Sequence, residues 1–273
     1  STWLTMFCYL DLDFNDSRAA YKRAYEFVEH NSIKYGLSTN ILQDLGGREK
    51  KGVAQHFAND FEWSRSNPGR VRVNPQPASR LVFELNDADS PLAAENFFCL
   101  CMGSKGISKE SKVPLHYLGT MIHRYSPSLG IIQGGDINKG NGSGGESIFG
   151  KKFKDDTKGL KLKHDCRGVL SMGNSGKNSN SSQFFITLKP DGAPVCDKKH
   201  VVFGQLIHGF DTLDLMQGLF DNPPEGAEKS ADEEAPPFEL TITGCGEWNP
   251  SVDLVNGFYD SDDVFKERMP EKK

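Results

Sequence analysis

Long hydrophobic runs are missing from this 273-residue sequence. No stretch of about 18 apolar residues occurs, which is the length that a membrane-spanning helix needs. The N-terminus STWLTMFCYLDLDF also lacks the basic region and extended apolar run of a signal peptide. We therefore expect a soluble protein with no membrane partner, although a chain that begins at Ser1 leaves open whether a targeting segment was removed.

Closely spaced cysteines are missing as well. The chain has no CxxC pair and no dense cysteine spacing of the kind that stabilises small secreted domains; its six cysteines are Cys8, Cys99, Cys101, Cys166, Cys196 and Cys245. Scattered single cysteines are typical of proteins in a reducing compartment. We therefore expect a cytoplasmic location.

An excess of positive charge is also absent. The chain has 32 Lys and Arg residues against 37 Asp and Glu residues, which gives a formal net charge of −5. This balance provides no general attraction to a polyanion, so we expect no nucleic-acid partner. Hydrophobic residues at 37 % and aromatic residues at 10 % are enough for a substantial core. For this length we expect one main domain with appended segments.

The first eighty residues have the pattern of a strand followed by helices. An apolar run gives way to alternating apolar and acidic residues, which predicts a strand over 5–13. Ser17 is a candidate N-cap for an amphipathic helix that has apolar residues at helical spacing from Ala20 to Val28. Further helical pieces broken at glycines follow, and the proline-containing stretch 64–79 is typical of a linker.

From Arg80 onward the pattern changes to short β-rich runs separated by glycine-rich stretches. Such spacing is typical of an antiparallel barrel or sandwich. Ser90 as N-cap and Pro91 at the first helical position predict one helix within this region. A second helix fits 210–219, and the alternation that starts at Phe238 predicts a closing strand.

Two further segments are charged and lack a regular hydrophobic period. The stretch 221–237 is acidic and rich in proline, and the residues after Trp248 form a charged tail. We expect both segments to be exposed.

Four separated motifs, in the same order along the chain, closely resemble the cyclophilin family of peptidyl-prolyl cis-trans isomerases. They are HRYSPSLGIIQGGD (123–136), GNGSGGESIFG (140–150), GVLSMGNSGKNSNSSQFFIT (168–187) and KHVVFGQLIHG (199–209). The resemblance covers about Arg80 to Gly246. It implies a mainly β fold, an eight-stranded antiparallel barrel capped by two helices, in agreement with the pattern of the runs.

Parts of these motifs also have other interpretations. GNGSGGES is similar to a phosphate-binding glycine loop, but no GK[ST] follows it and no clear βαβ unit surrounds it, so we interpret it as a turn. His123, His164 and His200 lack the spacing and cysteine partners of metal ligands, so we predict neither a metal nor another cofactor. Arg124 on its own would be read as a surface residue in a salt bridge, and only the surrounding motif makes it a catalytic candidate.

The resemblance implies the roles of the site residues. Rotation about an X-Pro bond requires amide resonance to be broken, and the twisted prolyl nitrogen then gains a lone pair that a fixed guanidinium can hydrogen-bond. Arg124 takes this catalytic role, and Gln133 orients it. The proline pocket corresponds to Ile131, Leu129, Phe185, Cys196 and His200, and the peptide-anchoring positions are Gly173, Asn174 and Gln183.

The sequence departs from the family pattern at three positions. One residue more than usual lies between Arg124 and Gln133, so Leu129 or Gly130 replaces a pocket phenylalanine and the pocket is expected to be looser. Val195 replaces a tryptophan whose indole N–H donates to cyclosporin, so we expect cyclosporin-like ligands to bind with reduced affinity. Cys196 replaces a leucine, which removes about 1–2 kcal/mol of apolar contact from a well-buried site.

The region after Gly106 further resembles the cyclophilins that carry a divergent loop. Those proteins share two cysteines and a glutamate, which correspond here to Cys101, Cys245 and Glu146. The resemblance implies that Cys101 and Cys245, the latter just after the last strand, form a disulfide under oxidation while Glu146 tethers the loop. The alternative is a pair of buried, inert thiols.

The expected organisation places the first barrel strand at 1–14, a largely helical insertion with a proline-rich linker at 15–79, the barrel at 80–248 and a charged tail at 249–273. An independent N-terminal domain is the alternative. The leading functional hypothesis is an isomerase that acts on X-Pro bonds of proline-containing polypeptides, with a role in protein folding. The alternatives are a non-enzymatic proline-peptide binding module and a scaffold subunit of a larger assembly.

Overall fold

The computed structural model describes residues 6–75, 79–222 and 234–249. These residues form two compact units, one containing residues 6–12 with 79–222 and 234–249, and the other containing residues 13–75. The tail 249–273 lies outside the described residues except for Asn249, as does 223–233 of the acidic stretch, so the expected exposure of these segments stays a prediction. No helix in the described ranges has the length and apolar character needed to span a membrane.

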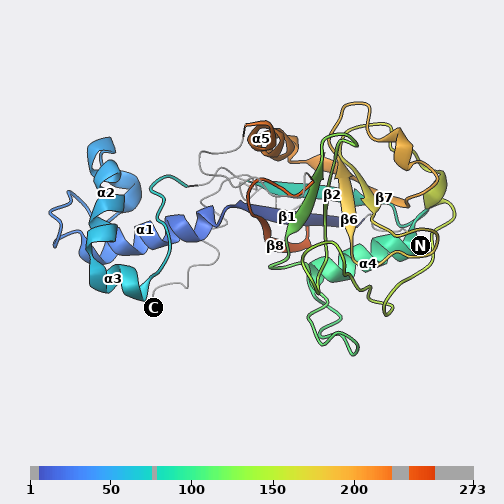
Figure 1. Ribbon diagram of the computed structural model, residues 1–273, viewed down its shortest axis with the longest axis horizontal. Coiled ribbons are helices and arrows are strands. Elements are labelled where there is room, and N and C mark those ends of the chain that lie inside the picture. The colour runs from blue at the N-terminus through green and yellow to red at the C-terminus, as the bar shows by residue number, and fades with distance from the viewer. Residues whose placement is uncertain (1–5, 76–78, 223–233, 250–273) are drawn as a thin grey trace. The chain divides into compact units, whose positions relative to one another are not determined.

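The larger unit is a nearly closed antiparallel barrel of eight strands (Figure 1). The strands are β1 (Phe7–Phe14), β2 (Arg80–Leu85), β3 (Ile122–Ser126), β4 (Ile131–Gly134), β5 (Val169–Met172), β6 (Phe184–Thr187), β7 (Val202–His208) and β8 (Leu240–Glu247). Their order in the sheet is β3-β4-β6-β5-β7-β2-β1-β8, and an isolated bridge from Met121 to Thr241 joins the two ends. The predicted fold class, an eight-stranded antiparallel barrel, is therefore confirmed.

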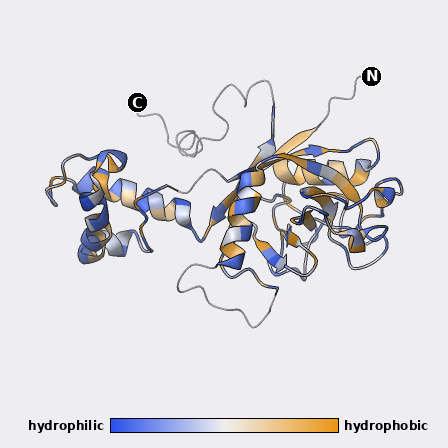
Figure 2. Ribbon diagram, turned by 90° about the horizontal axis from the view of Figure 1, so that it is seen from above, coloured by the Kyte–Doolittle hydropathy of each residue, from blue (hydrophilic) through white to orange (hydrophobic). Residues whose placement is uncertain are grey.

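The barrel interior is filled by aromatic rings, and Figure 2 shows the hydrophobic colouring concentrated on the strands. Phe97 lies at the centre of these rings, with its centroid 5.3 Å from those of Phe184 and Phe203 and 5.2 Å from that of Tyr117. Phe97 belongs to α4 (Pro91–Met102), which buries seven of its twelve residues. This helix therefore packs into one opening of the barrel and contributes its main core side chain.

The start of α4 follows the sequence prediction in position but not in its hydrogen bonding. Ser90 is the N-cap residue and Pro91 is the first helical residue, as predicted. The Ser90 hydroxyl, however, donates to the Val202 carbonyl at 2.6 Å and makes no capping bond within the helix. Asp156 takes over the capping function, because its carboxylate accepts from the backbone N–H groups of Leu92 and Ala93.

The second barrel helix, α5, spans Phe210–Asp221 and extends two residues beyond the predicted end. Its N-cap residue is Gly209, whose φ of 94° lies in the left-handed region. A Cβ atom at this position would lie 2.1 Å from the Arg80 carbonyl oxygen, so only glycine fits the turn between β7 and α5. Leu213, Met216 and Phe220 are buried, as their helical spacing predicts.

The smaller unit contains α1 (Ser17–Asn31), α2 (Gly47–Asn59), α3 (Phe61–Ser66) and the short 3₁₀ helix η1 (Leu42–Asp44). Its core is formed around Phe27, whose ring is 5.5 Å from Phe57 and 6.1 Å from Trp63. The prediction that Ser17 is an N-cap is wrong. Ser17 is the first helical residue, and its hydroxyl donates to Asp13 at 2.9 Å because Asp16 already adopts the N-cap position.

The connection between the first two strands contains the helical residues. β1 pairs with β2 in antiparallel register from Phe7 opposite Glu84 to Asp11 opposite Arg80. One step further, the Leu12 N–H donates to the Ser79 carbonyl at 3.0 Å. Residues 13–78 therefore form a single connection. The two barrel residues that flank it, Leu12 and Ser79, are hydrogen-bonded to each other.

Candidate active site

Arg124 lies on β3 directly opposite Gln133 of β4 in the register of the two strands. The strands are joined by a short turn that ends at Gly130, where φ is 68°. Cross-strand neighbours share one face of a sheet, so the two long side chains meet. Arg124 Nη1 donates to Gln133 Oε1 over 3.1 Å, which fixes one end of the guanidinium.

The contact between Arg124 and Gln133 continues into a chain of side-chain hydrogen bonds. Gln133 Nε2 donates to Gln183 Oε1 at 2.7 Å. Gln183 in turn donates from Nε2 to the carbonyl oxygens of Gly142 and Gly144, at 2.9 and 2.7 Å. Both amide side chains therefore have defined orientations. The glycine-rich loop 140–150 supports Arg124 through Gln183 and Gln133.

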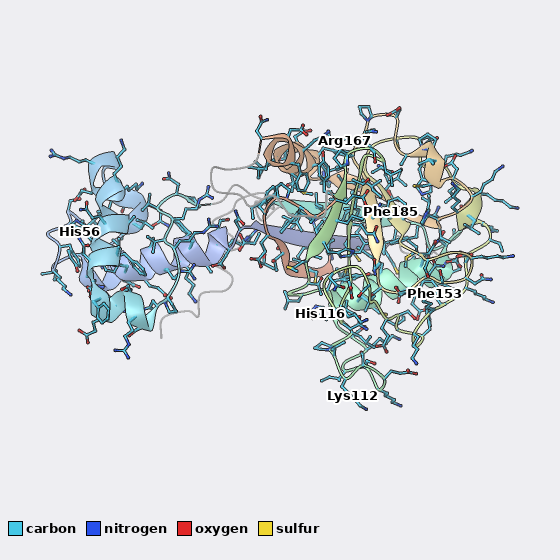
Figure 3. The ribbon with its side chains drawn as sticks, in the orientation of Figure 1. His56, Lys112, His116, Phe153, Arg167 and Phe185 are labelled. Atoms are coloured by element: carbon cyan, nitrogen blue, oxygen red, sulfur yellow. The ribbon has the colours of Figure 1, made fainter. Side chains whose placement is uncertain are left out.

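An apolar cluster, which corresponds to the predicted proline pocket, lies beside this polar chain. Half-buried Leu129 packs against its buried members. These are Ile131, Phe185, Ala193 and Cys196. Phe185, labelled in Figure 3, comes from the barrel strand β6 and forms a T-shaped contact with the His200 ring at 5.2 Å. The structure thus brings together the predicted pocket residues Ile131, Leu129, Phe185, Cys196 and His200.

Two histidines hold the Phe185 ring from different sides. The His164 ring stacks on it with centroids 5.6 Å apart and an interplanar angle of 16°. Burial lowers the pKa of both His164 and His200 below the usual histidine value, which favours the neutral imidazole. His200 is also oriented by the Met172 carbonyl, which lies 2.9 Å from its Nδ1 atom. The polar edge of the predicted pocket is therefore the neutral imidazole of His200, whose orientation is fixed.

The predicted peptide-anchoring residues lie at the end of β5. Gly173 N–H donates to the Gln183 carbonyl at 2.8 Å, and Asn174 Nδ2 donates to the Lys199 carbonyl at 2.8 Å. Both residues lie just beyond the strand, because β5 ends at Met172. They are nevertheless close to the pocket, since a Cβ atom on Gly173 would lie 3.3 Å from Gln133 Nε2.

The main residue that sequence reasoning missed is Glu234. Its carboxylate accepts from Arg124 Nε at 2.7 Å and from Arg124 Nη2 at 3.0 Å. Ser126 Oγ also donates to the Glu234 carboxylate, at 2.6 Å, and the Tyr125 N–H donates to its main-chain carbonyl at 2.7 Å. Hydrogen bonding from Arg124 lowers the pKa of Glu234, so the carboxylate is charged at neutral pH.

No local sequence signal could have identified Glu234. It belongs to the acidic stretch 221–237, which resembled a solvated connection, and 110 positions separate it from Arg124. The described residues on either side of this stretch are held by stacked rings. Tyr125 stacks on Phe220 at 4.1 Å, and Phe220 stacks on Phe238 at 5.1 Å.

The three residues predicted as a redox set come from α4, β8 and the glycine-rich loop 140–150. All six cysteines are free thiols. Cys101 is fully buried in α4, and burial raises its pKa well above the usual thiol value. Cys245 is half-buried, 3.4 Å from His116 Nε2, and lies within β8, so its expected position after the last strand is wrong. Glu146 accepts from Ser108 Oγ at 2.5 Å, which links it to the loop after Gly106.

Comparison with known proteins decides the family. The profile described as "Cyclophilin type peptidyl-prolyl cis-trans isomerase/CLD" matches residues 70–247, well over half of the chain. This chain is a member of the cyclophilin family. The cyclophilin match includes the whole polar chain and the apolar cluster described above.

Curated relatives match a similar length of the chain. The chain is 41 % identical over 177 residues to peptidyl-prolyl cis-trans isomerase cyp11 of Rhizopus delemar. It is 46 % identical over 176 residues to the NK-tumor recognition proteins of Mus musculus and Homo sapiens. These alignments cover 65 % and 64 % of this chain, but only 48 % of the first relative and 11 % of the other two. The chain therefore spans less than half of the length of these relatives.

Proposed function

We propose that this chain is a peptidyl-prolyl cis-trans isomerase that accelerates rotation about X-Pro bonds in polypeptides. One observation carries this proposal: a positioned guanidinium, Arg124, lies beside an apolar cluster that contains Phe185 and Ile131. The reaction needs neither a nucleophile nor a metal, because no covalent bond is made or broken. It needs a dry pocket for the proline ring and a donor that acts on the twisted amide.

Arg124 acts through its difference in affinity for two states of the substrate. The uncatalysed barrier of about 18–20 kcal/mol reflects the loss of amide resonance. As the bond twists, the prolyl nitrogen becomes pyramidal and acquires a lone pair that accepts a hydrogen bond, whereas the planar ground state offers the donor little. A bond made only in the transition state lowers the barrier. An arginine held by Gln133 loses little orientational freedom when it makes this bond.

The other site residues bind and orient the substrate in this proposal. Phe185, Ile131, Leu129 and Cys196 enclose the proline ring, while the neutral His200 closes the pocket without an unpaired charge. The backbone at Gly173 and Asn174 holds the residue that precedes proline. Gln183 anchors the peptide and fixes the orientation of Gln133.

Exchange spectroscopy by NMR on a short X-Pro peptide tests the isomerase. We expect catalytic amounts of the protein to accelerate cis–trans exchange, and Arg124→Ala to remove most of the acceleration while peptide binding changes less. Arg124→Lys keeps the charge but not the rigid fork of donors, so it should restore only a small part of the rate. Arg65→Ala, at an exposed position in α3, is the matched control. A peptide that binds without faster exchange would contradict catalysis.

That last outcome would favour a second function, a proline-peptide binding module or scaffold subunit. The engagement of Arg124 by Glu234 favours it, because the guanidinium is then shared between the substrate and an internal carboxylate. Binding isotherms recorded on the same samples separate the two functions. An isomerase shows both binding and exchange, and a binding module shows binding alone.

We further propose that residues 15–79 are an insertion in the first hairpin of the barrel, not an independent N-terminal domain. The pairing of β1 with β2 and the Leu12–Ser79 hydrogen bond support this organisation. Long surface insertions add only about 0.6 kcal/mol of closure entropy for each doubling of their length, so the barrel tolerates them.

A further inference from the structure

The carboxylate of Glu234 occupies one edge of the Arg124 guanidinium. The bonds from Nε and Nη2 to its two oxygens, 2.7 and 3.0 Å long, form the bidentate geometry that arginine makes with carboxylates. Gln133 takes a third N–H, from Nη1. A guanidinium has five N–H donors, so one on Nη1 and one on Nη2 are left for a substrate. Arg124 is therefore able to donate to a substrate while it stays bonded to Glu234 and Gln133.

The position of Glu234 is fixed independently of its ion pair with Arg124. Its main-chain carbonyl accepts from Tyr125 N–H, and its carboxylate accepts from Ser126 Oγ, so two bonds to β3 hold it beside the arginine. Both charged side chains keep partial solvent access, 33 % for Arg124 and 40 % for Glu234. The ion pair carries no net charge as a whole, and Glu234, its negative member, lies at the edge of the site.

The sheet order indicates which part of a bound peptide faces this carboxylate. Neighbouring strands run in the order β3-β4-β6-β5, with Arg124 and Glu234 at β3 and Gly173 just beyond β5. Phe185 on β6 and Ile131 on β4 form the pocket between them. If Gly173 holds the residue before proline and the pocket holds the proline ring, the residue after proline points toward β3 and hence toward Glu234.

We propose that Glu234 is a specificity-determining residue that disfavours acidic side chains, and favours basic ones, immediately after the proline. This inference rests on the proposed proline-binding function of the same site. An unpaired Arg124 would attract an acidic or phosphorylated residue at that position. With Glu234 in place, the attraction is cancelled and the carboxylate is available to a lysine or arginine of the substrate.

Three peptides that differ only after proline, with Lys, Ala or Asp at that position, provide the test. Affinity and exchange rate are measured by NMR for each peptide with the wild-type protein, Glu234→Gln and Glu239→Gln. Glu234→Gln removes the charge while keeping the size of the side chain. Glu239→Gln removes one charge from an exposed residue five positions along the same segment, whose carboxylate accepts a hydrogen bond from Thr241 Oγ1. Dispersion of the amide spectrum checks that both variants are folded.

We expect the wild-type protein to prefer Lys over Asp, and Glu234→Gln to shift the Asp-to-Lys ratio toward Asp by roughly fivefold, the size expected for a charge pair at a partly solvated surface. Glu239→Gln should leave the ratio within about 1.5-fold of wild type, since its charge is not paired with Arg124. A ratio that is the same in wild type and Glu234→Gln overturns the proposal.

Two further outcomes separate this proposal from the proposed function. If the Ala peptide binds without faster exchange, isomerase activity fails, but the ratio of affinities still decides the role of Glu234. If the Ala peptide is isomerised and the charge ratio is unaffected by Glu234→Gln, only the specificity proposal fails. If none of the three peptides binds to the wild-type protein, both proposals are overturned.

Discussion

The imidazole of His164 lies flat against the ring of Phe185, with centroids 5.6 Å apart. Both imidazole nitrogens have partners, because Nδ1 is 3.1 Å from Asp197 Oδ1 and Nε2 is 2.9 Å from Ser171 Oγ. His164 is fully buried. Phe185 of the proposed proline pocket is therefore supported by a titratable group that has no contact with solvent.

The burial of His164 predicts a loss of stability in mild acid. Burial lowers its pKa below the usual value of 6.5, although Asp197 acts in the opposite direction. Between the folded-state pKa of His164 and its unfolded-state value of 6.5, the unfolded chain binds more protons than the folded chain. The stability that depends on neutral His164 is therefore complete above pH 6.5 and is lost as the pH falls through the folded-state pKa. Urea denaturation at a series of pH values measures this dependence.

Substitution of His164 identifies its share of that dependence. His164→Gln should reduce the slope of stability against pH and cost about 1–3 kcal/mol at neutral pH, because Asp197 and Ser171 lose a partner. The pKa of Asp197 is lowered from 3.8 to about 2, so the stability that Asp197 contributes is lost as the pH falls between these two values. An unchanged slope in His164→Gln would show that other groups control the acid sensitivity.

Val195 predicts weak binding of cyclosporin. Its side chain is 55 % exposed in the 3₁₀ helix η3 (Pro194–Cys196), beside Cys196 of the pocket. Val195→Trp adds an apolar surface and an indole N–H donor, and we expect a gain in cyclosporin affinity of about tenfold, which corresponds to about 1.4 kcal/mol. Val195→Phe supplies the surface without the donor. Titration calorimetry would contradict this account if the phenylalanine variant gained as much affinity as the tryptophan variant.

Oxidation with hydrogen peroxide is predicted to join Cys101 to Cys245. The two thiols give up two electrons and two protons, and the peroxide is reduced to water. The high pKa of buried Cys101 predicts a reaction slower than modification of exposed Cys166. Peptide mapping identifies the link, and the exchange assay tests whether activity falls when it forms.

The structure also identifies a competitor for this disulfide. Cys8 of β1 is a neighbour of Cys101 that helps to raise the pKa of its thiol, so a Cys8–Cys101 peptide is the alternative product. Cys245→Ser should protect the protein from oxidative loss of activity, and Cys166→Ser should not. Finding the Cys8 product in place of the Cys245 product, or full activity of the oxidised protein, would remove the proposed switch.

Replacement of residues 13–78 by Asn-Gly tests the insertion. Leu12 and Ser79 already form the hydrogen bond of a hairpin end, and Asn-Gly is a preferred two-residue turn between strands. We expect a folded barrel that is about 3 kcal/mol more stable, because the closed loop becomes shorter by about five halvings of its length. Denaturation and amide spectra of the shortened and full chains provide the measurement. A shortened chain that fails to fold would show that the helices are required by the barrel.

Local patterns predicted the elements whose stability comes from a regular period. The alternation near Phe7 predicted β1, and the spacing of Leu213 and Met216 predicted α5, because each pattern reflects the burial of one face. The motifs that contain Arg124, Gln133 and Phe185 predicted residues that the fold brings together. Their catalytic and binding roles are still predictions.

The features that sequence failed to predict depend on contacts between distant segments. The Ser90 hydroxyl satisfies the Val202 carbonyl and not its own helix, because burial against β7 offers a fixed acceptor. Glu234 was missed for a similar reason, since an acidic residue in an aperiodic stretch gives no indication of which arginine it will meet. Only the closure of the barrel brings the two segments together.

The placement of β1 between β2 and β8 has a consequence for synthesis on the ribosome. The helices between β1 and β2 contact one another locally, so they are able to fold once the chain has emerged to about residue 75. β1 gains its first partner when β2 follows, but its second edge has no neighbour until β8 is made at residues 240–247. Throughout elongation of the barrel, the newborn chain therefore presents an open strand edge at β1, which is the form of exposure that chaperones bind and that promotes misassembly.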